Sequence, residues 1–183
     1  MAKPFFTIGH STRSVEELAG LLQQSMVARL VDVRTVPRSR ANPQFNRDSL
    51  PDSLAGYRIG YSYLEALGGL RGRSKTVASD VNGFWDNDSF HNYADHALGA
   101  AFKAGFEQLL ELGRRERVAV MCAEAVWWRC HRRIVADHLL AHGEEVWHIL
   151  SAGHVERASL TRGAVVGADG LVRYPAAQAS LAL

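Results

Sequence analysis

The feature that most constrains the fold is a pair of short apolar runs, close together in the sequence and separated by one helix-length segment. Residues 5–8 are aromatic and β-branched, and residues 30–33 form a second apolar run, which indicates two buried strands. Between them, Ser14 precedes Glu17 by three residues in a capping-box pattern, and apolar residues follow at helical spacing to about residue 25. A strand, a helix and a strand in so short a span favour two parallel strands joined by a right-handed crossover.

The same alternation continues in the second half of the chain. Residues 118–122 and 146–150 are further apolar runs, and residues 93–113 and 129–142 have helical periodicity. Residues 165–172 have the pattern of a small hairpin. We therefore expect an α/β, Rossmann-like three-layer sandwich. Its sheet should be mainly parallel with about four to five strands, with a long insert after the second strand and a small C-terminal hairpin.

The insert covers residues 37–83, where three prolines and six glycines interrupt any regular period. Residues 50–67 within it are compatible with short helices. A stretch of this length without regular structure usually covers a functional site, and its tyrosines argue against a solvated linker. We expect residues 1–175 to form one α/β domain and residues 176–183 to form a flexible C-terminal tail.

Charge and cysteine content exclude several classes of protein. The 183 residues carry a net charge of +2, which is too balanced for a protein that coats nucleic acid through bulk charge. The charge is uneven, because residues 29–75 hold nine basic and four acidic side chains and residues 80–116 hold three and seven; the first section is therefore suited to meet an anion. Two cysteines are too few for a disulfide scaffold. Without a signal-peptide pattern or a membrane-length apolar run, we expect a cytoplasmic, reduced protein with no membrane partner.

Polar and reactive side chains follow the predicted strands. They are His10 and Ser11 after the first strand, Asp32 and Arg34 at the second, and Cys122 and Glu124 at the third. Ligands of parallel sheets bind beyond the carboxyl ends of the strands, where the strand order reverses. Any one of these residues has a structural explanation, such as a histidine that only holds a loop. Their convergence on one edge predicts a site in which His10, Asp32 and Glu124 transfer protons.

The segment 122–133 holds the densest chemistry. Cys130 and His131 are expected in the first turn of a helix, beside three arginines, and such surroundings lower the pKa of a thiol and hold an anion. Cys130 is therefore a candidate nucleophile with His131 beside it, although it could also pack as a small buried hydrophobe. Cys122, at a strand end, is a candidate for packing or for support of that thiol.

An anion would be bound by arginines and by exposed backbone amides. The candidates for that role are Ser11, Arg34, Arg38, Arg40, Gly68, Gly69, Arg71 and Arg132. No metal site is predicted, since the two cysteines are eight residues apart and lack the spacing of structural zinc ligands. No cofactor is predicted either, because the chain has no P-loop and no G-x-G-x-x-G after the first strand.

Several of these motifs together resemble a known family. They are Thr7-Ile8-Gly9-His10-Ser11-Thr12, Leu30-Val31-Asp32-Val33-Arg34 with Pro37-Arg38-Ser39-Arg40, Pro43-Gln44-Phe45-Asn46, Leu67-Gly68-Gly69, Met121-Cys122-Ala123-Glu124, and Cys130-His131-Arg132 with His148-Ile149. In this order they are similar to the bacterial and archaeal domain-of-unknown-function family 488, over about residues 5–175. The chain departs from the family pattern at Trp127, where a proline is expected, and at Ala158-Ser159, where a histidine is expected. The resemblance implies a single α/β domain without an established activity.

Three functional hypotheses follow. The first is an enzyme, a hydrolase or a transferase, that acts on a small phosphate-bearing or nucleotide-like ligand through a Cys/His/Glu site. The second is an accessory protein in DNA or RNA processing that binds nucleic acid through the basic section 29–75. The third is a thiol-based redox sensor in which Cys122 and Cys130 form a disulfide.

Overall fold

The computed structural model describes residues 3–176 and contains a six-stranded sheet and a separate two-stranded hairpin. The strands are β1 (Phe5–Gly9), β2 (Arg29–Asp32), β3 (Gly60–Tyr63), β4 (Val118–Cys122), β5 (Val146–Ser151), β6 (His154–Arg157), β7 (Val165–Val166) and β8 (Val172–Arg173). The helices are α1 (Val15–Gln24), α2 (Leu50–Ala55), α3 (Asp88–His96), α4 (Ala100–Arg115) and α5 (Arg132–Ala141). Short 3-10 turns lie at Pro43–Phe45, Glu65–Leu67 and Trp127–Arg129.

The six strands are arranged in the order β3-β2-β4-β1-β5-β6. All neighbouring pairs are parallel except β5 and β6, which form an antiparallel edge. Gly9 lies opposite Cys122, and Asp32 lies opposite Met121. The carboxyl ends of β1, β2 and β4 are therefore level with one another at one edge of the sheet.

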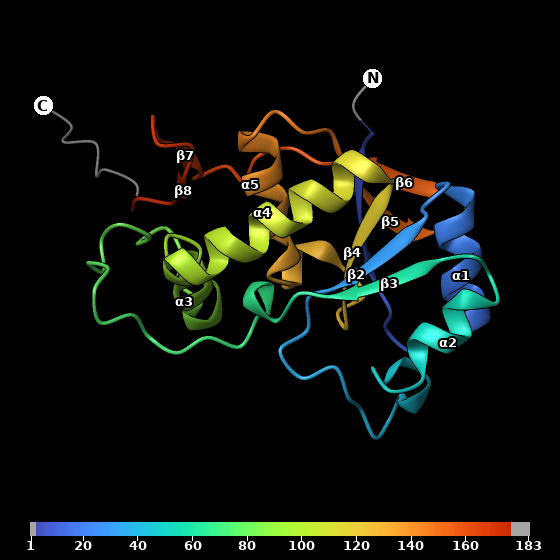
Figure 1. Ribbon diagram of the computed structural model, residues 1–183. Helices are drawn as coiled ribbons and strands as arrows, with labels where there is room; N and C mark the ends of the chain where they lie inside the picture. The colour runs from blue at the N-terminus through green and yellow to red at the C-terminus, as the bar shows by residue number, and fades with distance from the viewer. Residues whose placement is uncertain (1–2, 177–183) are drawn as a thin grey trace, which may run out of the picture.

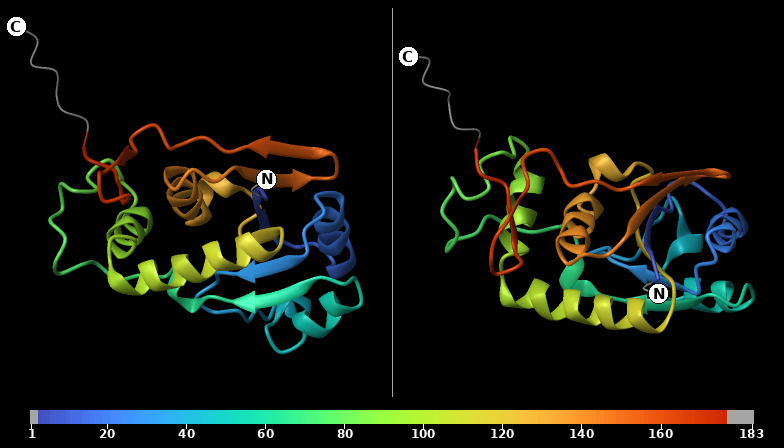
Figure 2. Two further views of the ribbon diagram at one scale, coloured as in Figure 1. Left: turned by 45° about the horizontal axis from the view of Figure 1, so that its top comes forward. Right: turned by 90° about the horizontal axis from the view of Figure 1, so that it is seen from above.

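Helices cover both faces of the sheet, as Figures 1 and 2 show. On one face α1 and α2 pack against side chains such as Ile8 and Leu30. On the other face α4 and α5 pack against side chains such as Val31 and Val120, which alternate with the first set. The interior strands are apolar throughout because both of their faces are buried. This arrangement confirms the predicted three-layer α/β sandwich.

The strand connections diverge at the end of β4. The chain leaves β1 and β2 toward α1 and α2 on one face, whereas it leaves β4 toward α5 on the opposite face (Figure 1). Since β4 lies between β1 and β2, neighbouring loops diverge on either side of it. This is the topological switch point at which open α/β sheets hold their ligands.

The sheet has two strands that the sequence pattern did not predict. β3 lies inside the insert, where Gly60 and Ser62 interrupt the apolar run, and β6 is a polar edge strand with mostly exposed side chains. The sheet therefore has six strands rather than four or five. The rest of the insert consists of α2 and short turns.

The helices agree with the sequence pattern in position but not at every boundary. Ser14 caps α1 as predicted, since its hydroxyl accepts the Glu17 amide. The helix expected over residues 93–113 is divided into α3 and α4 around Gly99, which caps the second of them. The helix expected from residue 129 begins at Arg132, so that Cys130 is not in its first turn but in extended backbone before it.

The predicted C-terminal hairpin is present as β7 and β8. The residue after it, Tyr174, is held at the end of the insert, where Phe84 donates its amide to the Tyr174 carbonyl and Asn82 accepts the Tyr174 amide. The predicted tail, residues 176–183, lies outside the described residues except for residue 176. That residues 1–175 form a single domain stays a prediction. Within residues 3–176, no helix has the length and apolar character needed to cross a membrane.

Candidate functional site

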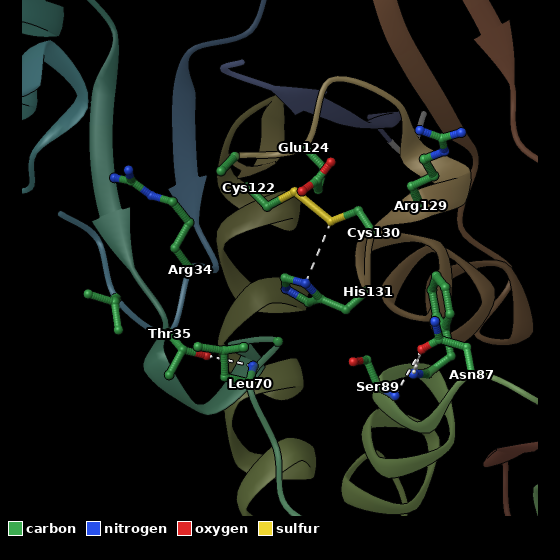
Figure 3. Close-up of a pocket in the computed structure, with 14 residues that line it drawn as sticks. Arg34, Thr35, Leu70, Asn87, Ser89, Cys122, Glu124, Arg129, Cys130 and His131 are labelled. Atoms are coloured by element: carbon green, nitrogen blue, oxygen red, sulfur yellow. Dashed lines mark hydrogen bonds between the residues drawn. A yellow bond between two sulfur atoms is a disulfide. The ribbon is translucent and has the colours of Figure 1, made fainter. Parts of the chain in front are cut away.

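A cavity of about 410 Å³ lies at the carboxyl end of β4. Its walls come from the segments that follow β2 and β4, from the insert, from the start of α3 and from the turn before α5 (Figure 3). The lining residues are Arg34, Thr35, Val36, Gly69, Leu70, Asn87, Ser89, Phe90, Cys122, Ala123, Glu124, Arg129, Cys130 and His131. Segments far apart in the sequence therefore meet at the predicted edge of the sheet.

The two cysteine sulfurs meet at the base of this cavity. Cys122 is the last residue of β4, and Cys130 follows the 3-10 turn that brings the chain back toward the strand end. Extended backbone at Cys130 aims its side chain at Cys122, and the structure joins the two as a disulfide (Figure 3). Both residues are buried.

Arg132 lies directly behind the sulfurs and is 1% exposed. Its Nε donates to Cys122 Sγ at 3.0 Å, and its two terminal nitrogens donate to Thr7 Oγ1 at 3.3 Å and to the Glu124 carbonyl at 2.6 Å. Among the described residues no carboxylate forms an ion pair with it. Burial lowers the pKa of Arg132 to about 9. A buried guanidinium without a carboxylate partner is costly, so a negative charge at the sulfur would stabilise this site.

His131 lies on the other side of Cys130. Its Nε2 is 3.0 Å from the Val33 carbonyl, an acceptor, so we assign the proton to Nε2 and leave Nδ1 as an acceptor. Nδ1 is 3.6 Å from Cys130 Sγ. Burial lowers the pKa of His131 to about 4, which makes the ring neutral at physiological pH.

Asp32, Arg34 and His10 form a second cluster beside the sulfurs. Arg34 donates to Asp32 from Nε at 2.9 Å and from Nη2 at 2.6 Å, and also to the Phe45 carbonyl and to His10 Nε2. Tyr61 donates at 2.6 Å to Asp32 Oδ2, the oxygen that also accepts from Arg34 Nη2. The Asp32 carboxylate and the Arg34 guanidinium are therefore engaged with each other and with the surrounding chain.

His10 is held in a neutral form by the same cluster. Its Nδ1 is 2.8 Å from the Ser11 carbonyl, which requires a donor, and its Nε2 accepts from Arg34 at 3.2 Å. Burial is the main cause that lowers the pKa of His10, and its ring stacks on Phe45. Both nitrogens are thus occupied, so His10 fixes the position of Arg34.

A neighbouring pocket of about 340 Å³ contains His10 and Ser11. It shares Arg34, Val36, Ala123 and Glu124 with the sulfur pocket. Glu124 is exposed at this shared rim. Apart from Asp32, which is buried and lines neither pocket, the catalytic candidates are divided between the two, with Glu124 at the boundary and the cysteines in only one of them.

The glycine at the end of β1 allows this crowded arrangement. A Cβ at Gly9 would overlap the carbonyl of Glu124. Without it, the loop after β4 passes directly over the end of β1, where His10 and Ser11 donate their amides to the carbonyls of Cys122 and Ala123. The close approach fixes that loop over the strand ends.

The predicted anion-binding residues have different environments. Gly69 lines the sulfur pocket, whereas Gly68 packs on Thr35. Arg71 donates to the carbonyls of Gly68 and Glu65 and so holds the insert in place. Arg38 lies at the second pocket and pairs with Asp48, and Arg40 is exposed and lines neither cavity.

Sequence reasoning missed the α3 side of the sulfur pocket. Asn87 caps α3 by accepting the amides of Ser89 and Phe90, and all three line the pocket together with exposed Arg129. The signal was available, because Asn87 directly precedes a helical run in the manner of an N-cap. Within residues 3–176, no group of three or more His, Cys, Asp or Glu side chains is placed to hold a metal ion.

A family model described as "Domain of unknown function DUF488" matches residues 14–139. The match covers more than half of the chain. The chain belongs to this family. The matched range includes β2, β4, both cysteines and Arg132, so the sulfur pocket lies within the DUF488 region. No curated protein and no solved structure matches the chain.

Proposed function

We propose that this DUF488 protein carries out thiol–disulfide redox chemistry, with Cys122 and Cys130 as a reversible pair. The observation that carries the proposal is the meeting of the two sulfurs at the base of a cavity at the switch point of the sheet. This proposal develops the thiol hypothesis drawn from the sequence. It also suits the predicted cytoplasmic location, where thiols are kept reduced unless they turn over.

The position of the cysteines favours a chemical role over a structural one. The chain buries apolar residues on both faces of its sheet, and a protein of this size folds without a covalent staple. A bond between residues separated by eight positions closes a short loop and stabilises the fold by about 2.5 kcal/mol in the chain-entropy treatment. A structural bond also has no need of a ligand-sized cavity above it.

The reaction transfers two electrons between the cysteine pair and a low-molecular-weight thiol–disulfide couple. In one direction the two protein thiols reduce a disulfide RSSR: one protein thiolate attacks it and releases RS⁻, and the second displaces RS⁻ from the mixed disulfide. The products are the internal disulfide and two RSH, which take up the two protons that the protein thiols lose. The reverse direction oxidises two thiols.

Mass spectrometry tests the proposal directly. The protein is reduced, freed of reductant, and treated with an excess of cystamine, a small disulfide. We expect intact protein lighter by two hydrogens, with Cys122 and Cys130 joined in one cross-linked peptide pair, and full return to the reduced mass with dithiothreitol. Cys122→Ser and Cys130→Ser should each stop at a mixed disulfide between the remaining cysteine and cysteamine. Stable adducts on both sulfurs of the wild-type protein, without an internal disulfide, would contradict the proposal.

An enzyme acting on a small anionic ligand is the second candidate. Arg129 is exposed at the rim of the sulfur cavity, and its neighbours Asn87 and Ser89 add polar groups there. Arg34 and Arg71 contribute less than expected, because their guanidinium groups are held within the protein. Calorimetry with inorganic phosphate and with a nucleoside monophosphate tests this candidate: binding that Arg129→Ala weakens would support it, and the absence of heat would remove it.

The nucleic-acid hypothesis has less support from the charge distribution. Three arginines of the basic section are paired with carboxylates: Arg29 with Glu116, Arg34 with Asp32, and Arg38 with Asp48. Their charge is therefore partly neutralised before any phosphate approaches. A mobility shift at low salt would restore this hypothesis.

A further inference from the structure

We propose that Arg132 makes the cysteine pair an electron acceptor, because its guanidinium gains a directly bonded counter-ion when Cys122 is a thiolate. The inference rests on the proposed redox function and adds its direction: the oxidised protein takes electrons from thiols and so forms disulfides in them. It also assigns a role to each sulfur, with Cys122 as the thiolate and Cys130 as the thiol.

Within residues 3–176 no carboxylate forms a direct ion pair with Arg132, and the Glu124 carboxylate acts on it only through space. Arg132 is buried behind the sulfurs and donates to one hydroxyl, one carbonyl and Cys122 Sγ, but to no carboxylate within residues 3–176. A hydrogen bond from a guanidinium to an anionic sulfur is much stronger than one to a neutral sulfur. The Nε–Sγ distance of 3.0 Å places Cys122 to supply that anion.

The two sulfurs have contrasting surroundings. Cys130 Sγ accepts the Arg132 amide at 3.4 Å and lies 3.6 Å from His131 Nδ1, so its neighbours are a dipole and a neutral ring. Nδ1 has no proton in the assigned tautomer and can accept the proton of a Cys130 thiol. Cys122 therefore lies beside a full positive charge, and Cys130 lies beside a proton acceptor without charge.

The charged and titratable groups around the pair come from every surrounding element. They are His10 and Arg13 after β1, Arg34 after β2, Glu124 after β4, Arg129 and His131 before α5, Arg132 in α5 and His148 in β5. Arg34 is neutralised by Asp32, and burial lowers the pKa of His131 and His148 so that both are uncharged near neutral pH. The full positive charge bonded to a sulfur is that of Arg132.

Oxidation changes the charge balance around Arg132. In the disulfide, Cys122 carries no charge, and Arg132 loses its directly bonded counter-ion. In the reduced protein the ion pair is complete. A group that stabilises the reduced form raises the reduction potential, as in strongly oxidising dithiol proteins.

The reaction then follows from the leaving group. A substrate thiolate RS⁻ attacks Cys130 Sγ, the sulfur–sulfur bond breaks, and Cys122 leaves as the thiolate held by Arg132, because the thiol of lower pKa leaves faster. A second RS⁻ attacks the sulfur of R in the mixed disulfide and forms RSSR. Cys130 leaves and takes up one proton from solution. The substrate thiols lose two electrons, and the protein pair gains them.

The equilibrium with glutathione tests this inference. Oxidised wild type, Arg132→Lys, Arg132→Met and Arg133→Met are equilibrated with glutathione buffers, and the reduced fraction is measured by thiol trapping. Arg133 is the matched control, since it is the next residue but bonds Thr161 and lies over Trp85 instead of the sulfurs. We expect Arg132→Met to shift the equilibrium at least tenfold toward the disulfide, which is about 30 mV. Arg132→Lys should shift it less and Arg133→Met not at all.

A second measurement keeps the inference testable if Arg132→Met does not fold. In the reduced Cys130→Ser variant, the thiolate absorbance of Cys122 should titrate well below the ordinary thiol pKa of about 8.5. In reduced Cys122→Ser, Cys130 should titrate higher than Cys122 does. A Cys122 that titrates at or above an ordinary thiol, or an equilibrium that Arg132→Lys and Arg133→Met leave equally unchanged, would overturn the inference. Failure to form any reversible internal disulfide would instead overturn the proposed function.

Discussion

The contact between the insert and His131 yields a prediction with a built-in control. Gly69 packs directly on the His131 ring: an added Cβ would lie 2.8 Å from Cε1 and 2.9 Å from Cγ, and closer still to Nδ1. The backbone of Gly69 is outside the left-handed region, so the penalty for alanine is steric contact alone. Gly72 lies in the same loop, and a Cβ added there would meet nothing within 4 Å, which makes it the matched control.

The cost of Gly69→Ala follows from what holds His131 on its other sides. The ring bonds the Val33 carbonyl at 3.0 Å and packs on Tyr93 with ring centroids 4.9 Å apart. Overpacking costs about 1–3 kcal/mol, and loss of the bond to Val33 costs about 1 kcal/mol. We therefore expect Gly69→Ala to lower the free energy of unfolding by about 2–4 kcal/mol, which corresponds to a drop in Tm of roughly 4–16 °C.

Urea unfolding and thermal denaturation of both variants provide the assay. Gly72→Ala should stay within about 0.5 kcal/mol of wild type or gain slightly, because alanine restricts the unfolded chain. Gly69→Ala should also slow formation of the internal disulfide, since displacement of the ring removes the proton acceptor beside Cys130. Equal stability of the two variants would refute the description of the His131 contact.

Three further predictions concern the rest of the fold. Burial lowers the pKa of His138 and of His148 to about 3, so the stability that these neutral rings support is present above pH 6.5 and is lost as the pH falls. We therefore expect His138→Leu to reduce the slope of the unfolding free energy against pH by about 1.4 kcal/mol per pH unit between about pH 6 and 4. An unchanged slope would contradict the assignment. Tyr61→Phe removes a 2.6 Å bond to the Asp32 carboxylate and should cost about 1.5–3 kcal/mol in urea unfolding, whereas Tyr57→Phe, whose hydroxyl makes no hydrogen bond within residues 3–176, should cost less than a third of that. Gly20→Ala, inside α1 with open space around it, should raise the unfolding free energy by about 0.5–1 kcal/mol, and a loss would show that the space is needed.

The parts of the fold that the sequence predicted well are those whose signal is local. The four apolar runs became β1, β2, β4 and β5 within one residue at each end, because strands buried on both faces must be apolar throughout. Ser14 capped α1 for the same local reason. The convergence of strand ends was also predictable, since parallel strands that alternate with helices end at a common edge.

The strands that were missed depend on partners distant in sequence. Gly60–Tyr63 has little strand character of its own and is ordered by pairing with β2. His154–Arg157 is an exposed edge strand whose polar composition protects it from further pairing. Neither carries an apolar run that a local pattern could detect.

The roles of the site residues depended on contacts that a sequence does not encode. Asp32, Arg34 and His10 have the residue types of a proton-transfer site, yet they bond to one another. Arg132 has the residue type of an anion ligand on the surface, yet it is buried against Cys122. Tertiary packing alone decides which arginine pairs with a carboxylate and which pairs with a sulfur.

A redox titration of the cysteine pair tests the central claim most directly. The protein is equilibrated under argon in a series of glutathione buffers of increasing reduced-to-oxidised ratio, and free thiols are trapped and counted by mass. We predict one reversible transition between zero and two trapped thiols, with the shape of a two-electron process, and its absence in Cys122→Ser and Cys130→Ser. Two thiols that remain free in every buffer, or a disulfide that persists in fully reduced dithiothreitol while the protein stays folded, would contradict the claim.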